Sequence, residues 1–225
     1  EWQQCVEYAR LDVDAMRAVH ERLPRWNDSL GERELWRLDQ GVNDGGVAVD
    51  GDLARSAIRA FERTTRSLAA RTAVLTDGTV GSATQRAALL NHLNNNFALG
   101  LTDMTGATVE QVLRGDLDPV AREILEIRQQ AAATSPAKYG ALLDAASSDG
   151  RLRGTIQFCG AARTGRDAGR IFQPQNLPRS PDWFDGEEQE RTVAAFKADA
   201  DDLLWGNVSD RCAWAVRGCL MAEQS

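Results

Sequence analysis

The sequence predicts a mostly α-helical protein with a small β component, of the α+β class. Apolar residues recur at helical spacing through most of the 225 residues, whereas alternation with a period of two appears only around Leu152 to Phe158. Capping residues and prolines mark the ends of several helical segments. We therefore expect a helical bundle and a short antiparallel strand segment near residues 150–175.

Five sequence signals predict the secondary structure of the first fifty residues. Residues 3–23 have apolar side chains at helical spacing, and Ser29-x-x-Glu32 is a capping box that predicts a second helix. Asn43-Asp44-Gly45-Gly46 predicts a turn, because these residue types favour turn conformations of the backbone. A short strand is expected over residues 47–49. Asp50 is then placed to cap a long helix.

The middle of the chain is predicted to be helical, with breaks. Ser82-x-x-Gln85 indicates the start of another helix, and a short helix is expected near residues 108–114. Asp118-Pro119 supplies an N-cap and a proline at the first helical position of the next helix. Pro136 is expected to break or kink that helix, because proline has no amide hydrogen to donate.

The last quarter of the chain is again predicted to be helical, over residues 185–204 and 208–220. The acidic run 199–202 falls in the first of these segments, and we interpret it as a solvated helix face. The four cysteines have no metal-binding spacing, so reduced, half-buried thiols in a cytoplasmic protein are expected. Cys212 and Cys219 lie seven residues apart on one helix face and are assigned to the core.

Charge is unevenly distributed along this acidic chain. The formal net charge is −7, and 43% hydrophobic and 26% charged residues are typical of a globular protein. The longest apolar runs are too short to cross a membrane. Residues 151–179 nevertheless contain six arginines and a single acid, Asp167. Concentrated positive charge favours a polyanion as partner, and arginine suits phosphates and base edges. The alternative is a solvated loop that binds nothing.

Two motifs within this basic segment carry a family resemblance. Thr164-Gly165-Arg166 and Gln175-Asn176-Leu177-Pro178 resemble, in residues and spacing, the template-primer-binding segment of family A DNA polymerases. The sequence departs from the family where Gln173-Pro174 replaces the usual Asn-Leu. An inserted Ala-Gly-Arg over residues 168–170 is similar to phage and prophage members.

The resemblance extends along most of residues 3–180, although it is specific only over 162–179. The segment from Leu38 to Asp50 resembles the entry into the polymerase thumb, and Leu125-Glu126-x-Arg128 with Lys138 resembles the thumb helix along the duplex backbone. Lysines that often precede Ser135 in bacterial members are absent. The resemblance implies three regions: the last helix of a 3′-5′ exonuclease domain (1–24), a helical thumb-like region (25–148) and the truncated start of a palm (149–225).

The resemblance also implies which residues contact primer-template DNA. Arg166 is expected in the minor groove at the primer end, and Gln175 and Asn176 opposite it on the template side. Arg163 and Arg170 are expected at phosphates. The full set of expected DNA-binding residues is Arg128, Lys138, Arg163, Thr164, Arg166, Arg170, Gln175 and Asn176.

Tyr8-x-x-x-Asp12 matches the third motif of the proofreading exonuclease in these polymerases. The spacing places the phenol and the carboxylate on one helix face, where a carboxylate can hold a divalent ion in phosphodiester hydrolysis. A solvated helix face is an equally good interpretation of the pair. The remaining metal-binding carboxylates are not found, so Tyr8 and Asp12 form an incomplete site.

Polymerisation requires paired palm carboxylates that hold Mg²⁺, and the sequence contains none that fit. The resemblance therefore implies the central part of a family A DNA-directed DNA polymerase, a nucleotidyltransferase of DNA replication that takes dNTPs only in its full-length form. As a fragment it is expected to be inactive, monomeric and located in the cytoplasm of a bacterial host cell. The alternative is a non-catalytic helical DNA-binding or replication-accessory protein derived from the polymerase thumb.

Overall fold

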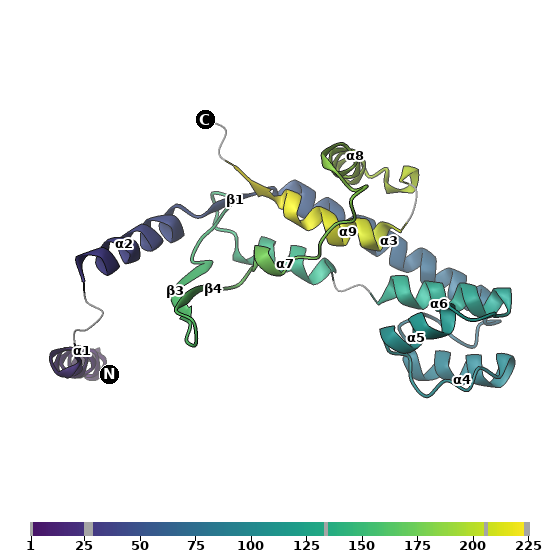
Figure 1. The fold of residues 1–225 in the computed structure, drawn as a ribbon, viewed down its shortest axis with the longest axis horizontal. Coiled ribbons are helices and arrows are strands. Elements are labelled where there is room, and N and C mark those ends of the chain that lie inside the picture. Colours follow the sequence, from purple (N-terminus) through teal and green to yellow (C-terminus); the bar gives the residue numbers. More distant parts are fainter. Residues whose placement is uncertain (1, 25–28, 133–134, 205–206, 223–225) are drawn as a thin grey trace. The chain divides into compact units, whose positions relative to one another are not determined.

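Helices dominate the structure, a computed structural model that describes residues 2–24, 29–132, 135–204 and 207–222 (Figure 1). The α-helices in these ranges are α1 (Trp2–Arg22), α2 (Leu30–Gly45), α3 (Gly51–Leu75), α4 (Arg86–Phe97), α5 (Gly106–Leu113), α6 (Pro119–Ala131), α7 (Ser135–Ala145), α8 (Gly186–Lys197) and α9 (Val208–Ala215). Short 3₁₀ helices are η1 (Pro174–Asn176), η2 (Asp201–Leu203) and η3 (Val216–Cys219). The mostly helical class expected from the sequence is confirmed.

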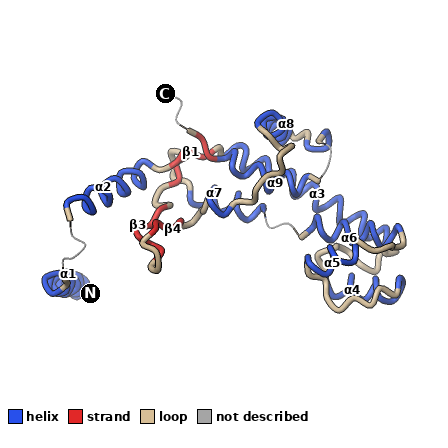
Figure 2. The backbone as a smooth tube through the Cα atoms, in the orientation of Figure 1, coloured by secondary structure: helices blue, strands red, loops and turns tan. Residues whose placement is uncertain are grey.

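Short strands form two small antiparallel sheets, drawn in red in Figure 2. The strands are β1 (Val47–Val49), β2 (Arg151–Leu152), β3 (Ile156–Ala161), β4 (Arg166–Gly169) and β5 (Leu220–Met221). One sheet has the order β2-β1-β5, and β3 pairs with β4 in the other. The β2-β1-β5 sheet therefore joins three segments that are far apart in the sequence.

The chain divides into two compact units, Glu1–Val42 and Asn43–Ser225. In the first, the described residues of α1 bury no side chain. In the second, α3 is the central element and packs against α6, α7, α8 and α9. The assignment of residues 1–24, 25–148 and 149–225 to polymerase domains stays a prediction.

The second unit contains two hydrophobic cores along α3. The first surrounds the amino-terminal half of α3, with Leu53 fully buried, and includes Tyr139 and both buried cysteines, Cys212 and Cys219. The second is formed by α4, α5 and α6 beyond the other end of α3, with Leu89 and Ile124 at its centre. Burial of these apolar side chains is the main stabilising contribution.

The predicted capping residues are confirmed for several helices. Ser29 Oγ accepts a hydrogen bond from Glu32 N at 3.2 Å, and Asp50 Oδ1 accepts one from Leu53 N at 2.9 Å. Asp118 Oδ1 accepts from Val120 N at 2.8 Å and caps α6, ahead of Pro119. Each bond satisfies an amide that the first helical turn leaves unpaired.

Two expectations about helix ends were wrong. The predicted turn at 43–46 is helical as far as Gly45, and the reversal occurs at Gly46, whose φ is +64°. The helix expected over residues 208–220 ends at Ala215, and the 3₁₀ helix η3 and strand β5 follow it. By contrast, the helix expected after Ser82-x-x-Gln85 is α4, which begins at Arg86.

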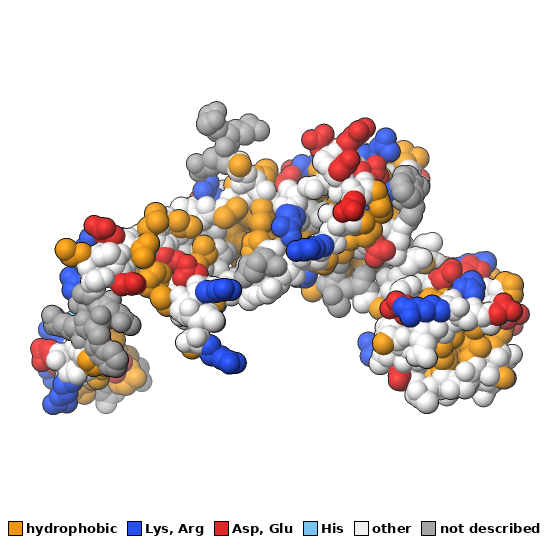
Figure 3. Space-filling model, in the orientation of Figure 1, with side chains coloured by type: hydrophobic (Ala, Val, Ile, Leu, Met, Phe, Trp, Pro, Cys, Tyr) orange, Lys and Arg blue, Asp and Glu red, His pale blue; other side chains and the backbone are white. Residues whose placement is uncertain are grey.

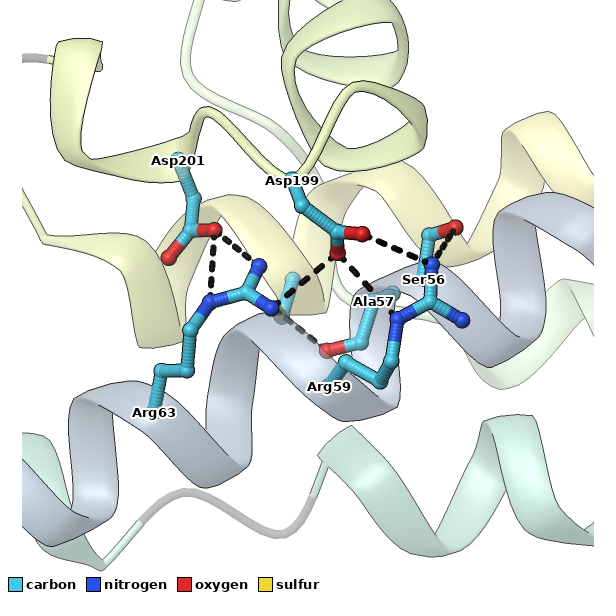
Figure 4. Close-up of polar contacts among 7 residues, drawn as sticks. Ser56, Ala57, Arg59, Arg63, Asp199 and Asp201 are labelled. Atoms are coloured by element: carbon cyan, nitrogen blue, oxygen red, sulfur yellow. Dashed lines mark hydrogen bonds and ion pairs between the residues drawn. The ribbon is translucent and has the colours of Figure 1, made fainter.

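The acidic run 199–202 is not a solvated helix face, which corrects the sequence interpretation. Helix α8 ends at Lys197, and Asp199 and Asp201 turn back toward α3 (Figure 4). Asp199 Oδ1 lies 3.1 Å from Arg59 Nε and 3.0 Å from Arg63 Nη1. Arg63 also binds Asp201, whose side chain is only 9% exposed. These ion pairs fix the segment after α8 on α3.

Candidate nucleic-acid interface

The Thr-Gly-Arg motif forms the tip of the β3–β4 hairpin. Arg163, Thr164 and Gly165 lie in the turn, and Arg166 is the first residue of β4. The turn is closed by hydrogen bonds from Thr164 N and Gly165 N to Ala161 O, at 3.0 and 2.9 Å. Gly165 has a φ of +64°, a conformation in which glycine carries no steric penalty.

The hairpin tip presents two exposed guanidinium groups. Arg163 and Arg166 are exposed, and within the described ranges neither has a hydrogen-bonded or ion-paired partner. Figure 3 shows basic side chains projecting at the end of this hairpin. Asp167, the only acid nearby in sequence, accepts a hydrogen bond from Cys159 N at 3.0 Å. The hairpin tip therefore offers positive charge to an external anion.

Arg170 differs from the two arginines at the tip. Its Nη2 donates a hydrogen bond to Gln157 Oε1 across the hairpin. Its backbone N donates to Thr155 O at 2.7 Å. The guanidinium has five N–H donors, so a phosphate contact by Arg170 can use donors other than the one bonded to Gln157.

The Gln-Asn-Leu-Pro motif and the residues just before it are anchored in the first hydrophobic core and hydrogen-bonded to the hairpin. Leu177 and Phe172 are buried, whereas Asn176 is exposed and donates to Gln173 Oε1. Gln173 Nε2 in turn donates to Gly169 O, at 3.0 Å, at the end of β4. The side chain of Gln175 lies outside the described part of the structure.

Lys138 and Asn176 line one surface groove, which brings together two of the residues predicted to bind DNA. The groove lies between α7 and the segment 171–177 and has a volume of about 390 Å³. Apolar residues form its walls, among them Ala141, Ile171 and Leu177. The amino group of Lys138 and the amide of Asn176 can bind polar groups of a nucleic-acid strand, while the sugars of that strand pack against the apolar residues of the groove.

Ile171 is a feature that sequence analysis missed. Its φ is +59°, and Phe172 N donates to Arg170 O at 2.5 Å, so residues 170–172 form a γ-turn. A β-branched residue in this region is strained, and this side chain is also 61% exposed. Glycine, asparagine or aspartate would have signalled such a backbone conformation in the sequence, whereas isoleucine does not.

Arg128 has a buried side chain, unlike the other described residues that are predicted to bind DNA. It is 5% exposed, its Nη2 donates to Met104 O at 3.4 Å, and its Nε has no hydrogen-bond partner. Burial, and secondarily the nearby charge of Arg86, lowers the pKa of the guanidinium. Its side chain is buried in this structure, and its contact with DNA stays a prediction.

Tyr8 and Asp12 lie one turn apart on α1. Both are exposed. In the parts of the chain that the structure describes, no group of three or more His, Cys, Asp or Glu side chains could hold a metal ion. Asp12 as a ligand of Mg²⁺, with Tyr8 beside it, therefore stays a prediction.

Two of the six arginines in the basic segment have a structural role. Arg151 Nε and Nη2 donate to the carbonyl oxygens of Gly45 and Gly46, at 2.5 and 2.9 Å. Arg153 Nε donates to Asp44 O at 2.8 Å, and its Nη2 lies 2.7 Å from Asp149 Oδ2. Positive charge at a helix carboxyl end is stabilising. The basic segment is thus divided between a structural base and an exposed tip.

Comparison with known proteins points to a DNA polymerase. No family model matches the chain, and no solved structure matches it. Over 223 residues, 99% of its length, the chain is 33% identical to the DNA polymerase of Bacillus phage SP02. It spans about a third (34%) of that relative. None of the described helices is long and apolar enough to cross a membrane. Along nearly its whole length, the chain is therefore similar to one part of a phage DNA polymerase.

Proposed function

We propose that this chain is the template-primer DNA-binding part of a family A DNA-directed DNA polymerase. The observation that carries the proposal is the hairpin tip, where Arg163 and Arg166 are exposed and no acidic side chain of the described residues pairs with them. The similarity to a phage DNA polymerase supports the same assignment at a coarser level. DNA is the polyanion that such an enzyme must hold.

The two sides of the proposed interface have different chemistry. The hairpin tip supplies guanidinium groups, which can reach phosphates or the acceptor atoms of the minor groove. The groove beside α7 supplies Lys138 and Asn176. Contacts of this kind are available on every base pair, so binding is independent of sequence.

Synthesis itself requires a metal site, and among the described residues no group of three or more His, Cys, Asp or Glu side chains could hold a metal ion. We propose that Mg²⁺ and dNTPs bind to other parts of the complete polymerase. The 225-residue chain is then expected to extend no primer and to degrade no 3′ end. Primer extension by purified chain would contradict this assignment.

Fluorescence anisotropy with a labelled primer-template duplex tests DNA binding. We expect weak binding, and an affinity that decreases with salt as counterions are released from the DNA. Arg166→Ala should weaken the affinity for DNA by about tenfold, which is near the lower end of the free energies found for base-edge contacts. Arg66→Ala is the matched control, because Arg66 is an exposed arginine on α3 outside the interface. Equal effects of the two substitutions, or salt-independent binding, would contradict the proposal.

A further inference from the structure

Asn43 makes an unusual contact with the base of the β3–β4 hairpin. Its Nδ2 donates to Ile156 O at 2.8 Å, and its Oδ1 accepts from Ile156 N at 3.0 Å. These are the two backbone groups through which a strand residue pairs with a neighbouring strand. The amide of Asn43 therefore takes the place of a strand at the first residue of β3.

The segment that enters the hairpin is fixed to the same short stretch of backbone. Arg151 and Arg153 donate to the carbonyls of residues 44–46, as described above, and Gly154 N donates to Asn43 O at 3.4 Å. Gly46 permits this close approach, because a Cβ at that position would lie 2.6 Å from Leu152 O. The hairpin base thus has several polar connections to residues 43–46.

The hairpin depends on these connections for its orientation. In the described residues β3 and β4 form a two-stranded sheet of their own. An isolated two-stranded hairpin is only marginally stable in water. Arg163 and Arg166 are at its far end, so any rotation at the base moves both guanidinium groups.

We propose that Asn43 is a positioning residue that orients the arginine tip of the β3–β4 hairpin toward DNA. The inference rests on the proposed DNA-binding function of that tip. Asn43 does not contact DNA itself, and its effect on binding passes through Arg163 and Arg166.

A double-mutant cycle on the 225-residue chain tests the inference, with anisotropy of primer-template DNA as the readout. Arg166→Ala should weaken binding by about tenfold in the natural sequence. In an Asn43→Ala background the same substitution should change affinity by about twofold or less, because a misplaced Arg166 no longer contributes its contact with DNA. Asn43→Asp should behave similarly, because a carboxylate cannot donate to Ile156 O.

Asn94 provides a matched control. Its side chain forms the same pair of hydrogen bonds, with Leu101 O at 2.9 Å and Leu101 N at 2.8 Å, in the second hydrophobic core. Asn94→Ala should remove an equivalent interaction while leaving the effect of Arg166→Ala at its full size. A purely structural role for Asn43 would make both asparagine backgrounds alike.

Amide hydrogen exchange, together with the binding data, distinguishes a failure of the proposed DNA-binding function from a failure of the positioning role of Asn43. Asn43→Ala should accelerate amide exchange over residues 155–170, whereas Asn94→Ala should do so only around residues 98–105. If Arg166→Ala has no effect in the natural sequence, the proposed DNA-binding function fails. If it has its full effect in both asparagine backgrounds, or if exchange in the hairpin is unchanged, the positioning role of Asn43 fails and the DNA-binding function stands.

Discussion

At the scale of single residues, the arginines of the basic segment are distinguished by their partners. Two bind backbone carbonyls, one binds a glutamine across the hairpin, and two at the tip have no partner among the described residues. Their partners lie elsewhere in the fold, so the sequence alone did not separate structural arginines from exposed ones. Hydrogen-bond partners far apart in the chain make the difference.

Arg166 and Arg170 should have different effects in the complete polymerase. Arg166→Ala is expected to slow extension and to reduce discrimination against a mismatched primer end, by roughly 1–3 kcal/mol, the value of a good base-edge contact. Arg170→Ala should instead lower duplex affinity and reduce the salt dependence by about one phosphate. Single-turnover extension from matched and mismatched ends, with binding isotherms at several salt concentrations, measures both. Identical behaviour of the two variants would make them equivalent surface charges.

The strained backbone at Ile171 gives a stability prediction. Ile171→Gly should raise the free energy of unfolding by about 1 kcal/mol, because glycine adopts a positive φ without the penalty that a β-branched residue carries. Little burial is lost, since the isoleucine side chain is 61% exposed. Urea denaturation of the 225-residue chain measures the change. Ile171→Ala keeps the strained backbone and should not stabilise, so stabilisation by alanine but not glycine would refute the explanation.

At the scale of secondary-structure elements, ion pairs hold the carboxyl end of α8 against α3. Arg63 binds Asp201, which is nearly buried, and hydrogen bonding to Asp201 raises the pKa of Arg63. Asp201→Asn should destabilise the chain by roughly 2 kcal/mol, somewhat below the 3–5 kcal/mol typical of fully buried pairs, because Arg63 is partly exposed. Asp202→Asn is the control, since Asp202 is an exposed neighbour. Chemical denaturation that shows equal losses for both variants would argue against a specific pair.

Asp50 connects the start of α3 to the end of α8 and should make stability depend on pH. Its Oδ1 caps α3, and its Oδ2 lies 2.5 Å from Lys197 Nζ. Burial raises the pKa of Asp50, but the hydrogen bonds from Lys197 and Leu53 together outweigh burial and leave the pKa below its ordinary value. The carboxylate therefore stabilises the fold above the unfolded-state pKa of about 4, and this contribution is lost as pH falls through the lower folded-state pKa.

Asp50→Asn should be less stable than the natural sequence at pH 7, and the difference in unfolding free energy should disappear on acidification. A gap in unfolding free energy that stays constant from pH 7 to pH 3 would contradict this role.

Local signals in the sequence predicted most of these elements but not their tertiary partners. Ser29, Asp50 and Asp118 cap their helices as expected, because a cap is a contact within a few residues. The acidic run after α8 was misinterpreted, because its partners Arg59 and Arg63 lie about 140 residues earlier. The exposed hairpin tip was located by its motif, whereas the groove beside α7 depends on packing between distant segments. Lys138 and Asn176 share that groove only in the folded chain.

At the scale of the whole molecule, stability is concentrated in the unit that begins at Asn43. Both hydrophobic cores lie there, whereas α1 buries no side chain among its described residues. Removing residues 1–28 should therefore change the free energy of unfolding of the remainder by less than about 0.5 kcal/mol, as for surface changes in general. Differential scanning calorimetry of the shortened and full chains measures the difference. A marked loss of stability would mean that α1 stabilises the core unit.

The contrast between exposed and buried cysteines offers a way to attach a reporter to the hairpin. Burial is the main cause that raises the pKa of the Cys212 and Cys219 thiols to about 12, so both stay protonated and unreactive toward maleimides near neutral pH. Cys5 and Cys159 are exposed, and Cys159 is part of β3 itself. Replacing Cys5 with serine would leave Cys159 as the one accessible thiol among the three remaining cysteines. A fluorophore on that thiol would sit on the arginine-bearing hairpin, and its emission would follow the arrival of DNA in real time.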